Sequence, residues 1–249
     1  MTTYSYLLDV IEKKGAAYLI LIDPDKISGE RLTMFVSVCE KAGVDGFLVG
    51  GSLLMGGNLE SAIDRIKKGS QLPTIIFPGA VHQLYDQADA VLYISLISGR
   101  NAEHIIGKHI IAAPIIKRME LEAISTGYML IESGVKTTAE YISGSSPIPR
   151  NKPEIAVATA LAGQYLGMKF IYLEGGSGAQ YSVPKEMVSA VSKAVDIPVI
   201  VGGGIRTPQE AHEKIENGAK VVVTGNYFED EKNWDLLKEF ADAIHKKGA

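Results

Sequence analysis

Short apolar runs alternate with amphipathic segments along the whole chain. Eight of these runs hold three to five residues and are bounded mostly by Gly, Pro or Asp, with many β-branched or aromatic side chains. Runs of this kind are typical of parallel strands that are buried on both faces. We therefore expect eight strands, the fifth having the weakest pattern: Tyr18–Ile22, Gly46–Val49, Thr74–Phe77, Ala90–Ile94, Tyr128–Ile131, Phe170–Leu173, Val199–Val201 and Val221–Val223.

Helical patterns lie between these runs. Ser182 before Pro184 and Thr207 before Pro208 are typical helix starts. Eight strand–helix alternations favour a closed (β/α)₈ TIM barrel over an open doubly wound sheet. The length of 249 residues is usual for one such barrel, so we expect a single domain over residues 1–249. The clearest predicted helices are Glu30–Ala42, Lys185–Ala194, Pro208–Asn217 and Asp230–His245.

Two stretches depart from this regular alternation. Asn101–Ser125 is long for a single crossover, and Pro114 is expected to interrupt a helix there. Ser133–Lys152 is rich in Gly, Ser and Pro, and we expect a loop with one helical turn after the fifth strand. Long loops at that end of a barrel usually carry function.

Composition narrows the classes of function. The chain is 46% hydrophobic with a net charge of −4 and no long basic run, so nucleic acid is not an expected partner. Cys39, the single cysteine, excludes an intramolecular disulfide. The polar N-terminus is unlike a signal peptide, and no apolar run reaches the roughly 20 residues of a membrane span. We expect a cytoplasmic protein, which a lipid-like substrate could bring to a membrane surface.

Three glycine-bearing segments follow the last three predicted strands. Glycine allows the backbone to approach an anion closely, and barrels commonly bind phosphate with the loops after their last strands. The hydroxyl of Ser177 and the amide of Asn226 would add donors. Tight turns alone are the alternative explanation, although three successive segments make it weaker. The segments are Tyr172–Gly178, Val201–Arg206 and Val223–Asn226.

The first two predicted strands end in oxygen-bearing side chains. Asp23 and Asp25 follow the first strand, and Ser52 follows the second through Gly50 and Gly51. A carboxylate and a hydroxyl at adjacent strand ends suit Mg²⁺, which completes its shell with water and phosphate. The alternative is that the two aspartates only cap the turn. The spacing does not choose between Asp23 and Asp25.

Together, these motifs resemble the geranylgeranylglyceryl phosphate synthase family of prenyltransferases. The resemblance runs from the first strand to the eighth. It implies transfer of a prenyl group, expected to be geranylgeranyl, from its diphosphate to the C3 hydroxyl of sn-glycerol 1-phosphate, which forms an ether of phospholipid biosynthesis and releases diphosphate. The motifs that carry it are Asp23-Pro24-Asp25-Lys26, Gly50-Gly51-Ser52, Phe77-Pro78-Gly79, Tyr172-Leu173-Glu174 with its Gly-Ser-Gly continuation, Gly202-Gly203-Gly204-Ile205 and Gly225-Asn226.

The resemblance also implies residue roles. Asp23 and Ser52 would bind the Mg²⁺ that carries the diphosphate, and Glu174 would take the hydroxyl proton, so Glu174 and Asp23 are the expected catalytic residues. Bracing of the glycine loop is the alternative role for Glu174. A homodimer or homohexamer is expected. The residues implied to hold glycerol phosphate are Tyr172, Leu173, Glu174, Gly175, Gly176, Ser177, Gly178, Gly203, Gly204, Gly225 and Asn226.

One position departs from part of this family. The bacterial heptaprenyl branch has a phosphate-binding lysine two residues before the first Asp, where this chain has Leu21. The chain therefore looks like the second, longer group of the family, found in archaea and some bacteria. Another cation or backbone groups must take over the role of that lysine.

An apolar trough is also required for the hydrocarbon chain of the donor. Apolar and aromatic residues gather near the ends of strands three to five, although ordinary barrel packing is the alternative for each, and Tyr128 is expected early on its strand. Other functions remain open: a sugar-phosphate isomerase using Asp23 and Glu174, another phosphate-binding barrel enzyme such as an aldolase, or a non-catalytic barrel that binds a phosphorylated metabolite. The trough candidates are Phe77, Pro78, Tyr93, Ile94, Leu96 and Tyr128.

Overall fold

In the computed structural model, which describes residues 1–245, eight parallel strands close into a barrel in chain order, and the eighth pairs with the first. All eight predicted runs fall on or overlap a strand, so the expected (β/α)₈ architecture is confirmed. The strands are β1 (Ala17–Ile22), β2 (Gly46–Val49), β3 (Thr74–Ile76), β4 (Ala90–Leu96), β5 (Glu122–Leu130), β6 (Phe170–Glu174), β7 (Val199–Gly202) and β8 (Val221–Thr224).

Side chains alternate between the two faces of the closed sheet. Leu19 and Tyr172 belong to the cluster inside the barrel, whereas Ile20 and Leu173 belong to the layer between the sheet and the helices. This alternation follows from the two-residue period of a strand. Because both faces are buried, the strands read as continuous apolar runs in the sequence.

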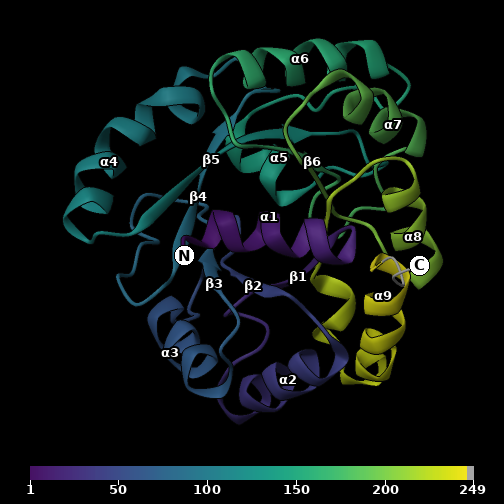
Figure 1. Cartoon of the computed structure of the whole chain (residues 1–249). Helices are drawn as coiled ribbons and strands as arrows, with labels where there is room; N and C mark the ends of the chain where they lie inside the picture. The colour runs from purple at the N-terminus through teal and green to yellow at the C-terminus, as the bar shows by residue number, and fades with distance from the viewer. Residues whose placement is uncertain (246–249) are drawn as a thin grey trace.

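Helices surround the barrel, as Figure 1 shows. The predicted start at Thr207 is confirmed: its side chain and that of Glu210 form a capping box, and Pro208 occupies the first turn. The α-helices are α1 (Thr3–Lys14), α2 (Gly29–Ala42), α3 (Leu59–Gly69), α4 (Lys108–Arg118), α5 (Thr138–Ser143), α6 (Pro153–Tyr165), α7 (Lys185–Ala194), α8 (Pro208–Glu216) and α9 (Leu237–Ile244). A π-helix, η1 (Glu103–Gly107), precedes α4, and the 3₁₀ helices η2 (Asn226–Glu229) and η3 (Glu231–Leu236) precede α9.

Three local predictions were wrong. β5 begins at Glu122 and not at Tyr128, because polar Ser125 and Thr126 hide its first half from an apolar pattern. Pro114 lies within α4 instead of interrupting it. The carbonyl that loses its bond belongs to Ile110, whose side chain is 69% exposed, so water can reach that side of the helix. The expected helix Asp230–His245 is divided into η3 and α9.

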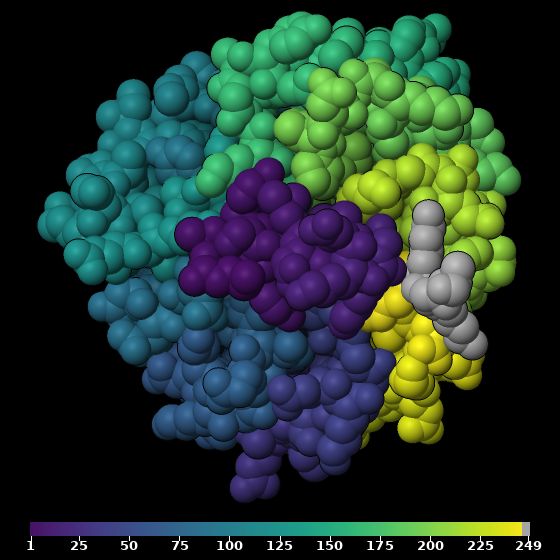
Figure 2. All heavy atoms as spheres, viewed as in Figure 1, coloured from purple at the N-terminus to yellow at the C-terminus, as the bar shows by residue number. Residues whose placement is uncertain are grey.

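The two ends of the barrel differ. Helix α1 lies across the amino-terminal end (Figure 1), and its atoms occupy the centre of that face in the space-filling view (Figure 2). Leu7 and Val10 of α1 are buried in the interior cluster, so this end is closed by packing. No helix within residues 1–245 combines the length and apolar character needed to cross a bilayer.

Candidate functional site

A cavity of about 890 Å³ occupies the carboxyl-terminal mouth of the barrel. Loops after β1, β2, β6, β7 and β8 line it, and Thr138 and Ala139 of α5 close one side. Segments far apart in the sequence therefore meet at the mouth. Ten predicted site residues line this cavity: Asp23, Ser52, Tyr172, Glu174, Ser177, Gly178, Gly203, Gly204, Gly225 and Asn226.

The side of the cavity formed by the last three strands presents backbone donors. Within residues 1–245, no backbone acceptor is found for a set of six N–H groups, all of them on cavity-lining residues. Unpaired amides that surround one cavity form a site suited to an anion. The six N–H groups belong to Ser177, Gly178, Gly203, Gly204, Gly225 and Asn226.

Gly203 allows these loops to approach one another. Its φ of +82° lies in the left-handed region, and a β-carbon there would stand 2.3 Å from Oε1 of Glu174 and 2.5 Å from the Gly176 nitrogen. Neither the conformation nor the space admits a side chain. Glycine at this position is therefore required for the close contact between the β6 and β7 loops.

Side chains brace the same loops. The hydroxyl of Ser177 lies 2.8 Å from Oδ1 of Asn226, which joins the β6 and β8 loops, and Nδ2 of Asn226 donates to Glu229 at 2.9 Å. The guanidinium of Arg206 donates to the carbonyl of Gln180 at 3.1 Å and to that of Ala179 at 2.5 Å. Arg206 and Lys26 both line the cavity, so cationic groups border it although position 21 is leucine.

Three residues expected to hold the phosphorylated substrate do not line the cavity. Leu173 is fully buried and faces the helices, because strand alternation turns it away from its neighbours Tyr172 and Glu174. The amides of Gly175 and Gly176 are already used, since they donate to the Gly202 carbonyl at 2.9 Å and to Oε1 of Glu174 at 2.6 Å. Leu173, Gly175 and Gly176 therefore stabilise β6 and its loop without lining the cavity.

Glu174 is the buried carboxylate of the cavity, with a residue exposure of 5%. Burial raises its pKa to about 7, although the Gly176 amide and the neighbouring Tyr172 hydroxyl favour the charged form. That hydroxyl is itself buried and makes no hydrogen bond of good geometry within residues 1–245. Glu174 thus braces the glycine loop with one oxygen and, at neutral pH, is poised between its charged and neutral forms.

The two aspartates after β1 differ in their hydrogen-bond partners. The carboxylate of Asp25 accepts the amides of Met55 at 2.7 Å and Gly56 at 2.9 Å, as well as that of Gly57, and these bonds lower its pKa. Asp25 therefore holds the loop between β2 and α3. Asp23 lines the cavity, and within residues 1–245 its carboxylate accepts only the Asp25 amide, at 2.9 Å through Oδ1, which leaves its other oxygen available.

The oxygen donors at this rim fit a magnesium ion. Within residues 1–245 no group of three or more His, Cys, Asp or Glu side chains could enclose a metal. The cavity lining instead offers the Asp23 carboxylate and the Ser52 hydroxyl from adjacent strand ends. Such a sparse set suits Mg²⁺, which keeps several waters and binds substrate phosphates, and it does not suit zinc, which prefers nitrogen and sulfur ligands.

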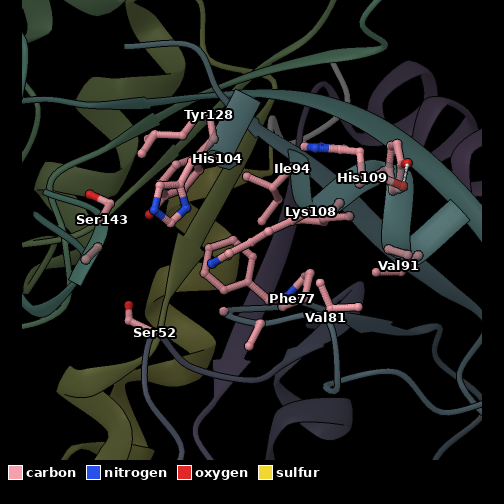
Figure 3. A pocket seen from close by; sticks show the side chains of 18 of the residues that line it. Ser52, Phe77, Val81, Val91, Ile94, His104, Lys108, His109, Tyr128 and Ser143 are labelled. Atoms are coloured by element: carbon pink, nitrogen blue, oxygen red, sulfur yellow. Dashed lines mark hydrogen bonds between the residues drawn. The ribbon is translucent and has the colours of Figure 1, made fainter. Parts of the chain in front are cut away.

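A second, apolar pocket of about 160 Å³ opens beside the cavity (Figure 3). All six trough candidates line it: Phe77, Pro78, Tyr93, Ile94, Leu96 and Tyr128. The two spaces adjoin, because five residues line both of them: Gly51, Ser52, Phe77, Tyr128 and Ala139. Because β5 starts early, Tyr128 lies near its carboxyl end and not early on the strand as expected.

The pocket lies where the closed barrel has its shortest strand and its shortest strand pairing. β3 has three residues and pairs with β4 only at Ala90 and Val91, so the rest of β4 has no neighbour there. No helix lies between β3 and β4 within the described chain. The pocket can therefore pass from inward-facing Leu92 to outward-facing Tyr93 and on to Ile116 of α4.

Several lining residues had no sequence signal that pointed to this site. His104 and Lys108 lie in the long stretch after β4, where a π-turn brings them over the pocket. Ala139 and Ser143 lie on α5, within the loop that had been predicted to be functional. The loop was predictable from its composition, but the side chains that it places were not.

The sequence of the chain was compared with those of known proteins. Residues 8–244 match the model of the PcrB family. The chain is 42% identical to the geranylgeranylglyceryl phosphate synthase of Chitinophaga pinensis, over 97% of this chain and 95% of the relative. It is 44% identical to the synthase of Thermococcus gammatolerans, over 87% and 86% of the two chains.

Solved structures lead to the same result. A crystal structure of (S)-3-O-geranylgeranylglyceryl phosphate synthase from Thermoplasma acidophilum, in complex with its substrate sn-glycerol-1-phosphate, superposes with a TM-score of 0.92. It is 32% identical to this chain and covers 98% of it, while 99% of the Thermoplasma chain is matched. On sequence and structure together, the chain belongs to the PcrB family.

Proposed function

We propose that the protein is a Mg²⁺-dependent prenyltransferase that joins the C3 hydroxyl of sn-glycerol 1-phosphate to a prenyl group and releases diphosphate. Geranylgeranyl diphosphate is the proposed donor. The observation that carries the proposal is the pairing of an amide-lined anion cavity with an adjoining apolar pocket, with Glu174 and Ser52 on the lining. The named activity of the relatives supports it.

Glycerol phosphate would bind on the side of the last three strands. Its phosphate would accept the unpaired amides of the β6, β7 and β8 loops, and the Ser177 hydroxyl would add a donor. The glycerol body would then extend toward Glu174 and Tyr172. When the phosphate is bound at one end of the substrate, the C3 hydroxyl at the other end is held in position to react. Orienting the reacting group in this way lowers the barrier to the reaction.

Glu174 would accept the proton of the C3 hydroxyl as the new ether bond forms. A carboxylate with a pKa of about 7 is a stronger base than an ordinary glutamate and is still largely ionised slightly above neutral pH. We therefore expect turnover to rise as the pH increases through about 7, because the ionised form is the active one.

The donor would place its hydrocarbon chain in the apolar pocket and its diphosphate at the rim formed by β1 and β2. Asp23 and Ser52 would hold Mg²⁺ there, and bound magnesium would stabilise the negative charge of the departing diphosphate. Phe77 and Tyr128 line both spaces and would exclude water from the reacting carbon.

The proposal extends to the setting of the enzyme. We place it in the cytoplasm as a homodimer or homohexamer, with peripheral membrane contact arising through its lipid-like substrate. Its place in metabolism is the synthesis of ether phospholipids.

The decisive experiment incubates the protein with Mg²⁺, labelled glycerol 1-phosphate and a series of prenyl diphosphates. We expect an organic-soluble labelled product that is lost when the metal is chelated. Formation of no such product with any donor would end the hypothesis.

Two variants test the residue roles. Glu174→Gln and Asp23→Asn should each abolish ether formation while circular dichroism shows an intact fold. Full turnover by either variant would refute the role given to that residue.

A further inference from the structure

Three basic side chains line the apolar pocket, His104, Lys108 and His109, and the proposed reaction does not yet use any of them (Figure 3). Within residues 1–245 no Asp or Glu lines this pocket, and Lys108 makes no ion pair there. A cation beside apolar surface loses hydration without gaining a partner. The side chain of Lys108 is half-buried, and without a protein counter-ion in the pocket it is available to an anion that enters.

The backbone that carries these side chains is fixed to the barrel. η1 precedes α4, and the Lys108 amide donates to the Glu103 carbonyl across the π-turn. The Ser95 hydroxyl of β4 donates to the Ile105 carbonyl at 2.5 Å, and the Tyr93 hydroxyl donates to the His109 carbonyl at 2.8 Å. Lys108 is thus held between two anchors to β4. Single π-turns occur frequently at functional sites.

The charge of Lys108 affects the imidazole of His104. The two residues are four positions apart, a spacing that makes neighbours on a helical surface. Burial lowers the pKa of His104, the charge of Lys108 lowers it further, and Glu103 opposes this change. The lowered pKa favours the neutral form of His104, whose ring N–H can still donate a hydrogen bond to an anion.

The position of Lys108 matches the boundary between the two spaces. Ser52, Phe77 and Tyr128 line the pocket together with Lys108 and also line the large cavity. In Figure 3 the Lys108 side chain extends across the pocket, with its amine in the direction of Phe77 and Ser52. A ligand with its anionic end at Ser52 and its tail in the pocket would pass this amine.

We propose that Lys108, assisted by His104, binds the diphosphate of the isoprenoid donor. The inference rests on the proposed function and adds a side-chain contact to the diphosphate beyond the Asp23–Ser52 rim. An uncharged hydrocarbon would gain nothing from the amine, and a free anion would gain nothing from the apolar wall. The ligand class is therefore a phosphorylated isoprenoid.

The test compares three ligands with the purified full-length protein: geranylgeranyl diphosphate, geranylgeraniol and inorganic diphosphate. Equilibrium binding is measured for wild type, Lys108→Met and Lys108→Arg. We expect Lys108→Met to weaken binding of geranylgeranyl diphosphate about ten- to a hundredfold, the usual effect of losing a charged hydrogen bond. Geranylgeraniol should bind unchanged, and Lys108→Arg should restore most of the affinity.

Lys117→Met is the matched control, since Lys117 is an exposed lysine of the same helix and lines neither space. It should bind all three ligands as wild type does. Unchanged affinity of Lys108→Met for geranylgeranyl diphosphate would overturn the inference, as would an equal loss for geranylgeraniol, which would indicate a packing role.

Steady-state kinetics separates this inference from the proposed function. If wild type makes the ether and Lys108→Met keeps the wild-type KM for the donor, the inference alone fails. If wild type makes no ether but still binds geranylgeranyl diphosphate through Lys108, the proposed reaction alone fails. Ether formation with a KM for the donor raised at least tenfold in Lys108→Met, and an unchanged KM for glycerol 1-phosphate, supports both.

Discussion

At the scale of single residues, the features that suit Glu174 to its proposed catalytic role also carry a cost in stability. Its carboxylate is buried and its pKa is raised from 4.5 to about 7, so the folded protein binds the proton more tightly than the unfolded chain does. Stability therefore falls as the pH rises from about 4.5 to about 7, and the full cost remains above that range. The difference corresponds to roughly 3 kcal/mol at most.

Glu174→Gln should consequently be more stable than wild type at pH 8 while being inactive. The amide has no charge to desolvate, and its oxygen can still accept the Gly176 amide. We expect a gain of up to about 3 kcal/mol in the free energy of unfolding. Denaturant unfolding of both proteins at pH 8 and pH 4 measures it. A gain of the same size at pH 4, where both side chains are neutral, would contradict the electrostatic explanation.

Gly203 offers a residue-scale test of the anion loops. Gly203→Ala should lose about 1–2 kcal/mol through its left-handed φ, and more through the clash with Glu174 and Gly176. Gly167→Ala is the matched control, because Gly167 has a φ of +83° and a β-carbon added there would meet nothing within 4 Å. Only Gly203→Ala should also raise the KM for glycerol phosphate. Equal kinetics in both variants would remove Gly203 from the site.

The sequence predicted which residues lie at the mouth of the barrel, but it did not predict their hydrogen-bond partners. Motif order was enough to bring Asp23, Glu174 and the glycines to one rim, since the ends of parallel strands meet at one edge of a barrel. Spacing alone did not distinguish Asp23 from Asp25, because the difference arises from amides of residues 55–57 that are distant in sequence. The orientation of Leu173 away from the mouth, by contrast, follows from strand alternation and could have been predicted.

At the scale of secondary-structure elements, the prediction of β5 was wrong because polar residues form part of a strand that is packed in the barrel. The first half of β5 carries Glu122, Ser125 and Thr126 and has no apolar run, yet its pairing with β4 begins at Glu122 and continues to Tyr128. The side chain of Glu122 accepts the amides of Thr3 at 2.5 Å and Tyr4 at 3.1 Å, so its polarity serves the start of α1. Tertiary contacts of this kind leave no trace in local periodicity.

The loop between β2 and α3 depends on one carboxylate, and this dependence can be tested. Asp25→Ala removes the acceptor of the amides of Met55, Gly56 and Gly57. We expect hydrogen exchange of these amides to accelerate about tenfold or more. The KM for the prenyl donor should rise, because Ser52 precedes this loop. Asp235→Ala, at an exposed aspartate outside both spaces, should change neither quantity.

At the scale of the whole molecule, the barrel separates function from stability along its axis. The carboxyl-terminal mouth contains the unpaired amides, the raised pKa of Glu174 and the open pocket. The amino-terminal end is filled by α1 and its contacts with the interior cluster. Polar groups at the amino-terminal end are paired instead: the buried Asp45 carboxylate accepts the Tyr18 amide at 2.8 Å, and Glu122 accepts the amides of Thr3 and Tyr4.

Leu7→Ala tests this separation, since Leu7 is 1% exposed in the cluster that α1 shares with the barrel interior. Removing its buried side chain should cost about 2–5 kcal/mol, which for a chain of this size lowers Tm by roughly 4–20 °C. Leu166→Ala makes the same change at a side chain that is 75% exposed and should shift stability by less than about 0.5 kcal/mol. Below the transition temperature, both variants should keep the wild-type KM for each substrate, because the mouth lies at the opposite end of the strands. A raised KM in Leu7→Ala would show that packing at the closed end sets the geometry of the anion loops.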